Sequence, residues 1–413
     1  MQPRQKQRSA VSRKKSCLQC ARSKTRCGLE RPFCHRCATA RRECVYATPV
    51  EDPPVGSRFS LLSDPSLPPI LNITTPVSSS TVFTFSPDVA HVGSTAESDP
   101  TALPLPPTPA NHEDGALDFS DLDLIPFPDA DHIRDRLLRP FFSVREQVPK
   151  TFQPYTLQYI TCVLRTYVKQ LAGNICVPPI IHSIQMSNGN TSVALANCCS
   201  LVRLWDQHAA GSEAMVAEII QREMSRLENC NADTHLDTLG SFQAYLIYAI
   251  IALLLPVQGS PAFNNETMET LQELAFRTAR AGLVSQAEVA RSRPTWESWI
   301  IAATKRRAIF TFYLLSSVYN ASQSVPNFLA EELREVYMPD AKRVWEARSR
   351  NEWEREYSQY LSGWKDGQVK VSELWRSPDT GSTVCRERID RWLQSADEFG
   401  MMLFAVCVHL HGY

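Results

Sequence analysis

Six cysteines near the amino terminus constrain this 413-residue chain more than any other feature. They form two halves with the same spacing, C-x2-C-x6-C, in the order Cys17, Cys20, Cys27 and then Cys34, Cys37, Cys44. Two residues between thiols let both sulfurs reach one metal ion, so each close pair can act as a clamp. Structural zinc takes four ligands, and six thiolates satisfy two zinc ions if two sulfurs bridge both metals.

Disulfides are the main alternative use of six cysteines. The first sixteen residues are basic and lack the apolar stretch of a secretory segment, and the seven other cysteines are an odd number scattered through apolar surroundings. That pattern is typical of reduced intracellular thiols. A redox role for the close pairs would need a βαβ pattern around them, and none is visible. We therefore expect zinc.

The segment SCLQCARSKTRCGLERPFCHRCATARRECVY resembles the DNA-binding domain of fungal zinc binuclear cluster (Zn2Cys6) transcription factors. The resemblance implies two zinc ions per chain, bridged by Cys17 and Cys34, with Pro32 in the joining loop. One ion would be held by Cys17, Cys20, Cys27 and Cys34, and the other by Cys34, Cys37, Cys44 and Cys17. It also implies a nuclear protein that binds double-stranded DNA and regulates RNA polymerase II genes, often of metabolic or secondary-metabolite pathways.

The region around these cysteines is strongly basic. Residues 1–46 hold thirteen Lys and Arg against two Glu, which predicts binding to a polyanion. In the resembling family, a lysine between the second and third cysteines contacts bases in the major groove, and Lys24 occupies that position. Lysine suits the O6 and N7 acceptors of guanine, in keeping with the CGG-like half-sites that the family usually reads.

Two positions depart from the family pattern. Ala21 and Ser23 stand where basic residues are usual, which leaves the half-site preference open. Arg22 and Arg26 are expected to contact the phosphate backbone, which positions a protein without reading sequence.

Residues 1–14 read as a disordered basic arm and residues 15–47 as the cluster domain. Lys14 and Lys15, where the arm meets the cluster, are predicted to contact DNA or to form part of a nuclear localisation signal. A merely solvated tail is the alternative.

Residues 48–130 are predicted to be a disordered, acidic linker. Residues 51–133 contain fourteen of the 28 prolines and thirteen Asp and Glu against Arg58 alone. No heptads follow the cluster, so the protein binds as a monomer or dimerises through its carboxy-terminal domain. Residues 118–127 alternate acids with bulky apolar residues. This favours either an activation segment that folds onto a partner or an element that staples the linker to the next domain.

Residues 131–413 are predicted to form a large all-α domain, so the chain as a whole should be mostly α. Apolar residues recur at helical spacing after Leu157, after a capping Ser212 and after a capping Asn265. The apolar run in residues 239–255 fits a buried central helix better than a membrane helix, because its apolar core is short.

Three stretches of this domain resemble the regulatory domain of fungal transcription factors: NCCSLVRLWDQ (197–207), WESWIIAATKRRAIFTFYLL (296–315) and MPDAKRVWEARSRNEWEREY (338–357). The resemblance implies a regulatory role through co-regulators, the transcription machinery or a small effector. In the resembling family an acid often precedes the paired arginines. This chain has Thr304 and Lys305 before Arg306 and Arg307 instead. We therefore expect a missing internal salt bridge, with the arginines on a solvated face or in a second nuclear signal.

No catalytic fingerprint is visible, and His409-x-His411 lacks a recognisable third ligand. The sequence predicts a non-enzymatic, DNA-binding transcription factor. The competing hypotheses are a repressor with the same DNA contacts, a thiol-rich metal-storage protein and an enzyme with an appended zinc module.

Overall fold

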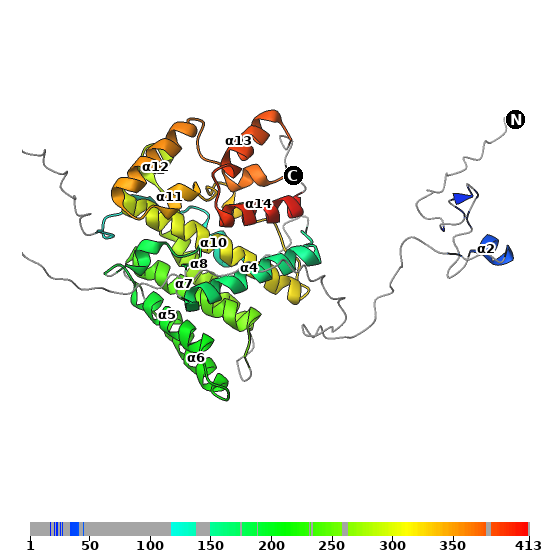
Figure 1. Cartoon of the computed structure of the whole chain (residues 1–413), viewed down its shortest axis with the longest axis horizontal. Helices are drawn as coiled ribbons and strands as arrows, with labels where there is room; N and C mark the ends of the chain where they lie inside the picture. Colours follow the sequence, from blue (N-terminus) through cyan, green and yellow to red (C-terminus); the bar gives the residue numbers. More distant parts are fainter. Residues whose placement is uncertain are drawn as a thin grey trace, which may run out of the picture. The chain divides into compact units, whose positions relative to one another are not determined.

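The computed structural model separates the chain into two compact units, Met1–Ala102 and Leu103–Tyr413 (Figure 1). In the first unit it describes Cys17, Cys20, Arg22, Ser23, Thr25, Cys27, residues 34–40 and Cys44. In the second it describes residues 117–137 and 149–411, except 174–175, 188, 231, 233, 258–262 and 377–380. Most of the predicted acidic linker therefore lies outside the described residues.

The first unit is built around its cysteines. Helix α2 spans His35–Thr39 and begins directly after Cys34, while Cys20 and Arg22 are helical in the preceding half. The cluster of buried residues in the described part of this unit consists of the six cysteine side chains, each at most 8% exposed.

The second unit is mostly helical, as predicted. Its α-helices are α3 (Ala130–Arg134), α4 (Pro154–Gly173), α5 (Val193–Asp206), α6 (Glu213–Glu228), α7 (His235–Leu254), α8 (Asn265–Arg280), α9 (Gln286–Val289), α10 (Trp296–Ser322), α11 (Lys342–Glu346), α12 (Arg350–Gly363), α13 (Thr383–Leu393) and α14 (Glu398–His411). Short 3-10 helices span Asp135–Leu137, Ser183–Met186, Glu331–Leu333 and Val371–Leu374, and two short strands, β1 (Leu124–Ile125) and β2 (Val284–Ser285), pair antiparallel.

Helices α7 and α10 form the centre of this unit (Figure 1). Helix α7 is apolar on every face and packs against α4, α5, α8 and α10. It is long and apolar enough to cross a membrane, yet 72% of its apolar window is buried by the surrounding helices. A helix that is apolar all round and enclosed in this way is a core helix, which agrees with the predicted central helix.

The helices predicted from periodicity are present, with two local corrections. Asn264 rather than Asn265 caps α8, because its side chain accepts a hydrogen bond from the Thr267 amide at 2.9 Å. Ser212 occupies the N-cap position of α6, but its hydroxyl donates to the Ala209 carbonyl instead of accepting from the helix.

The paired arginines on α10 are buried and paired, contrary to the expectation of a solvated face. Arg306 forms ion pairs with Glu288 at 3.0 Å and Asp340 at 3.1 Å, and these three side chains are at most 1% exposed. Arg306 also donates to the Leu283 carbonyl at 2.9 Å. The missing acid on α10 is replaced by carboxylates from two other segments.

Arg307 is buried in a second site on α10. It pairs with Asp397 at 2.7 Å, and its guanidinium lies 3.8 Å from the centre of the Trp345 ring. A nuclear localisation signal must be accessible to a receptor, so burial makes a second signal at residues 305–307 a wrong interpretation.

Lys305 completes this row of buried cations. Its ammonium group contacts the Ala281 carbonyl at 3.2 Å and His235 Nδ1 at 3.0 Å. Burial lowers the pKa of Lys305 to about 7.

Candidate metal centre and nucleic-acid interface

The six cysteine sulfurs gather into two sets of four. One set is Cys17, Cys20, Cys27 and Cys34, and the other is Cys17, Cys34, Cys37 and Cys44. Within each set the sulfur atoms lie within 4.8 Å of one another, and Cys17 and Cys34 belong to both. Among the described residues, no other group of side chains forms a comparable metal-ligating set.

The distances between sulfurs test whether zinc fits. A tetrahedral zinc–thiolate site with Zn–S bonds of about 2.3 Å has edges of about 3.8 Å. Cys17 and Cys34 Sγ are 3.8 Å apart, Cys20 and Cys34 Sγ 3.8 Å, and Cys17 and Cys37 Sγ 3.7 Å. A disulfide would need about 2.05 Å, and no cysteine in the described residues forms one. The sulfur cage therefore has the size and donor chemistry of two zinc sites that share an edge.

Backbone amides repeat the same contacts in both halves of the cluster. The Cys17 amide donates to Cys27 Sγ at 3.5 Å, and seventeen residues later the Cys34 amide donates to Cys44 Sγ at 3.3 Å. The Cys20 amide also donates to Cys17 Sγ at 3.4 Å. Hydrogen bonds of this kind stabilise and orient thiolate ligands. The repeated spacing in the sequence thus becomes a repeated geometry.

The thiols influence one another's ionisation. The Cys37 backbone amide lowers the pKa of the Cys34 thiol to about 6. Burial, helped by the neighbouring sulfurs of Cys17 and Cys34, raises the pKa of Cys20 to about 12. Six thiols this close do not all lose their protons unaided, whereas a divalent cation deprotonates a coordinating thiol outright. The site is suited to cations of this charge.

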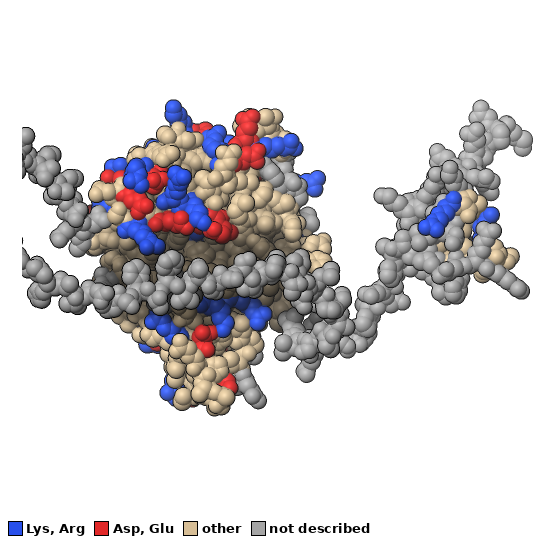
Figure 2. Space-filling view, in the orientation of Figure 1, with Lys and Arg blue, Asp and Glu red and all other residues tan. Residues whose placement is uncertain are grey.

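The predicted DNA contacts are described only in part. Arg22, in the helical turn after Cys20, and Arg36, on α2, are exposed beside the buried cage. Figure 2 shows Lys and Arg atoms at the surface of this unit. Lys24, the predicted base reader, lies outside the described residues, as do Arg26, Lys14 and Lys15.

The two terminal histidines have structural partners. His409 Nδ1 lies 2.7 Å from the Thr156 hydroxyl, and His411 is buried with its ring 6.4 Å from that of Trp375. Neither takes part in the metal-ligating sets found among the described residues.

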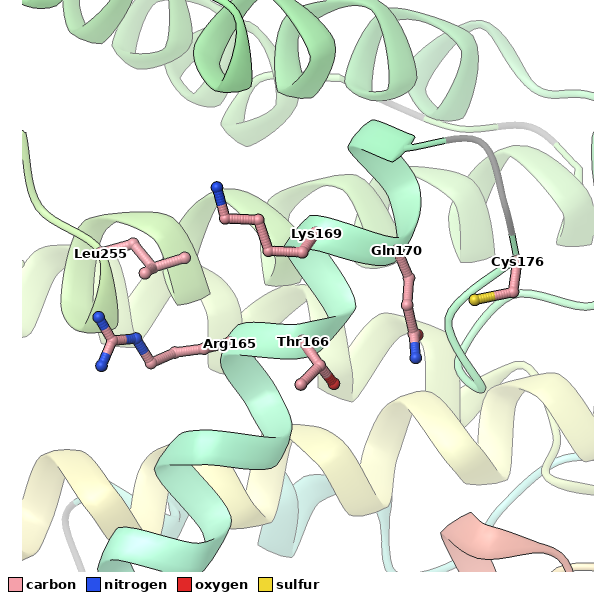
Figure 3. A pocket seen from close by; sticks show the side chains of 6 residues that line it. All are labelled: Arg165, Thr166, Lys169, Gln170, Cys176 and Leu255. Atoms are coloured by element: carbon pink, nitrogen blue, oxygen red, sulfur yellow. The ribbon is translucent and has the colours of Figure 1, made fainter. Parts of the chain in front are cut away.

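The second unit contains a groove of about 440 Å³ beside α4 (Figure 3). Its lining residues are Arg165, Thr166, Lys169, Gln170, Cys176 and Leu255. Lys169 is already engaged, since its ammonium group pairs with Asp206 at 2.6 Å. This lining offers no carboxylate or imidazole that would act as a general base.

Comparison with known proteins agrees with the geometry of the first unit. Residues 15–52 match the fungal Zn(2)-Cys(6) binuclear cluster domain. This segment is therefore a zinc cluster domain, a class that binds two zinc ions, in keeping with the two sets of sulfurs.

The transcription factor yanR from Aspergillus niger is 42% identical to this chain over 67 residues. The aligned part covers 16% of this chain and 8% of that protein, so the similarity is confined to a short segment. No solved structure matches the chain.

Sequence reasoning missed the buried ion network around Arg306 and Arg307 in the second unit. Its signal was the run of three cations, residues 305–307, inside a helix that is otherwise rich in apolar and aromatic residues. In such a helix, cations on several faces must be buried, and buried charges require partners.

Proposed function

We propose that this chain is a sequence-specific, DNA-binding transcription factor that acts in the nucleus on RNA polymerase II genes. The observation that carries the proposal is the double set of four sulfurs sharing Cys17 and Cys34, inside a segment that matches a zinc binuclear cluster domain. In this proposal all six cysteines are zinc ligands, and these two bridge the ions.

The cluster's task is to aim a short basic segment at DNA. The turn after Cys20 carries the exposed Arg22, and Lys24 follows two residues later. We assign Lys24 to guanine in a CGG-like half-site, and Arg22, Arg26, Lys14 and Lys15 to phosphates. The alternative of a metal store would require that the six buried sulfurs exchange metal readily.

The helical unit is proposed as a regulatory domain of the fungal transcription-factor type. Its support is the helical architecture and the buried positions of Trp296, Trp299, Arg306 and Arg307, residues that carry the sequence resemblance. In this proposal the groove beside α4 is a candidate binding place for a small effector.

The test compares binding of the full chain to a duplex with a CGG half-site and to the same duplex with that site scrambled. Lys24→Ala should lower the ratio of the two affinities about tenfold, since one base contact contributes about 1–3 kcal/mol of discrimination.

Lys6→Ala is the matched control, because it removes an equal charge from the arm. It should weaken binding to both duplexes equally and reduce the salt dependence. A ratio that Lys24→Ala leaves unchanged would refute the base-reading role. A wild-type protein with no preference for either duplex would refute the CGG-like half-site.

A further inference from the structure

An acidic segment of the chain, residues 117–127, lies against the helical unit; we call it the strap. Its apolar side chains are half-buried against the core, and they are Leu117, Phe119, Leu122, Leu124 and Phe127. Asp118 and Asp121, by contrast, are exposed. The apolar side chains of the strap therefore lie toward the domain, while Asp118 and Asp121 lie toward solvent.

The main chain of the strap is held by the region around β2. Leu124 and Ile125 form strand β1 and pair with Ser285 and Val284. This is the staple that the sequence offered as one of two interpretations. Helical unit and strap thus share a two-stranded sheet.

Asp123 attaches the strap to two further elements. Its carbonyl accepts a hydrogen bond from the Gln286 amide at 2.9 Å, and its carboxylate accepts from the Ala287 amide at 3.4 Å, both at the start of α9. Its own amide donates to the Ser298 hydroxyl on α10 at 3.3 Å. One residue therefore contacts both helices that follow β2.

Gly282 lets the strap approach the helical unit closely, because it has no side chain. This residue has φ of +100°, and an added Cβ would lie 2.7 Å from the Ile125 carbonyl oxygen and 2.8 Å from Leu124 Cβ. A side chain here is excluded by the strap as well as disfavoured by the backbone. We define the dock as residues 282–287 together with Ser298.

The dock is also linked to the buried ion network. Arg306 donates to the Leu283 carbonyl and pairs with Glu288, the residues on either side of the β2 and α9 contacts. The strap is held by two ladder pairs, by the hydrogen bonds of Asp123 and by half-buried side chains. Contacts of this limited extent open locally at a lower free-energy cost than the core of the unit.

We propose that the strap is an activation segment that the helical unit masks by docking it. The apolar side chains that a co-regulator would bind are the ones turned toward the domain, so docking and partner binding exclude each other. The partner that fits the released strap is a protein groove with an apolar floor and a basic rim, because Asp118, Asp121 and Asp123 accompany the apolar face. This inference rests on the proposed function.

The test replaces Gly282 with alanine in the full-length protein. Gly211→Ala is the matched control, because Gly211 also has a positive φ, +90°, and an added Cβ would meet nothing within 4 Å. Both variants place alanine at a positive φ and so carry comparable backbone strain, but only Gly282→Ala collides with the strap.

Two quantities are measured. Hydrogen exchange reports opening of residues 117–127, with the amides of α7 and α10 as an internal check of folding. Reporter transcription is divided by occupancy of the reporter's binding site, determined by chromatin immunoprecipitation.

Gly282→Ala should raise exchange in the strap about tenfold or more over Gly211→Ala, because only at Gly282 does the added methyl group overlap the strap, and overpacking of this kind costs enough for such a change. Output per occupied site should rise severalfold. Faster exchange with unchanged or lower output would overturn the masking role, and unchanged exchange would overturn the docked strap itself.

Ser298→Ala serves as the second variant if Gly282→Ala unfolds the unit. It removes the acceptor of the Asp123 amide and should raise strap exchange and output in the same direction, less strongly. A binding site left empty by the wild-type protein would refute the proposed function, while the exchange measurement would still decide whether the strap is docked.

Discussion

The interiors of the two units of this chain consist of different kinds of side chain. In the first unit, the buried cluster of the described residues is made of six sulfurs, linked by amide-to-sulfur hydrogen bonds. In the second, an extensive apolar core surrounds α7 and α10 and encloses paired charges. A segment of a few tens of residues buries too little apolar surface to fold alone, whereas some three hundred residues have enough.

Charge is used differently as well. Arg22 and Arg36 of the first unit point to solvent beside the metal cage, where they can reach a polyanion. In the second unit the two paired arginines of α10 are turned inward onto carboxylates, and on the face that Figure 2 shows, basic and acidic side chains are interspersed. The difference indicates that phosphate contacts belong to the first unit and that charge in the second serves its architecture.

Metal removal should separate the two units most sharply. A chelator should abolish DNA binding, because structural zinc supplies about 10–16 kcal/mol of apparent folding free energy to small zinc domains. The far-ultraviolet circular dichroism of the helical unit should persist. Loss of both signals together would show that the second unit also depends on the metal.

Substitution of a cysteine shared by both sets of sulfurs should change the number of bound zinc ions. Cys34→Ala should remove both zinc ions in native mass spectrometry, because Cys34 belongs to both sets of sulfurs. Cys162→Ala, at an exposed cysteine of α4, should retain two. A wild-type chain with one zinc ion would contradict the shared cage.

Breaking the buried ion network should destabilise the second unit alone. Arg306→Met leaves Glu288 and Asp340 buried without their cation, which costs about 3–5 kcal/mol. Arg222→Met, in an exposed pair with Glu218, should change stability by less than about 0.5 kcal/mol. Urea unfolding followed by helix content measures both, and the zinc count should stay at two. Equal effects of the two substitutions would show that the buried network contributes nothing special.

A smaller effect should appear on acidification. Burial, aided by Arg307, lowers the pKa of His182 to about 3, against about 6.5 in an unfolded chain. The unfolded state therefore binds one more proton below pH 6.5. Stability from this group is complete above that pH and falls by about 2 kcal/mol between pH 7 and pH 5.

The measurement is the urea midpoint of the helical unit at these two pH values. His182→Gln should reduce the dependence by about 2 kcal/mol and leave the part contributed by His235 and His411, because burial lowers the pKa of each of these two to about 4. His132→Gln, at an exposed histidine, should leave the dependence unchanged. A slope unaltered by His182→Gln would assign the acid sensitivity to other groups.

Much of the fold could be predicted from periodicity. The spacing of apolar residues after Leu157 predicted α4, and the continuous apolar run predicted that α7 is buried. Capping was harder, because Asn264 and Asn265 are both suitable residues and the choice depends on where the backbone turns. For residues 118–127 the sequence favoured an element that staples the linker to the domain but did not exclude an activation segment, since a strand that docks and a segment that binds a partner need the same alternation.

The cysteine spacing by itself determined the metal chemistry, because short fixed separations between thiols leave few ways to share two ions. Only the tertiary structure decided the surroundings of Arg306 and Arg307. Their partners Glu288, Asp340 and Asp397 come from three separate segments, and no local pattern links them to α10. The same holds for Gly282. Only glycine fits at this position, because strand β1, more than 150 residues earlier in the chain, occupies the space that a side chain would need. Local chemistry is encoded in spacing, whereas the pairing of distant segments depends on how the core packs.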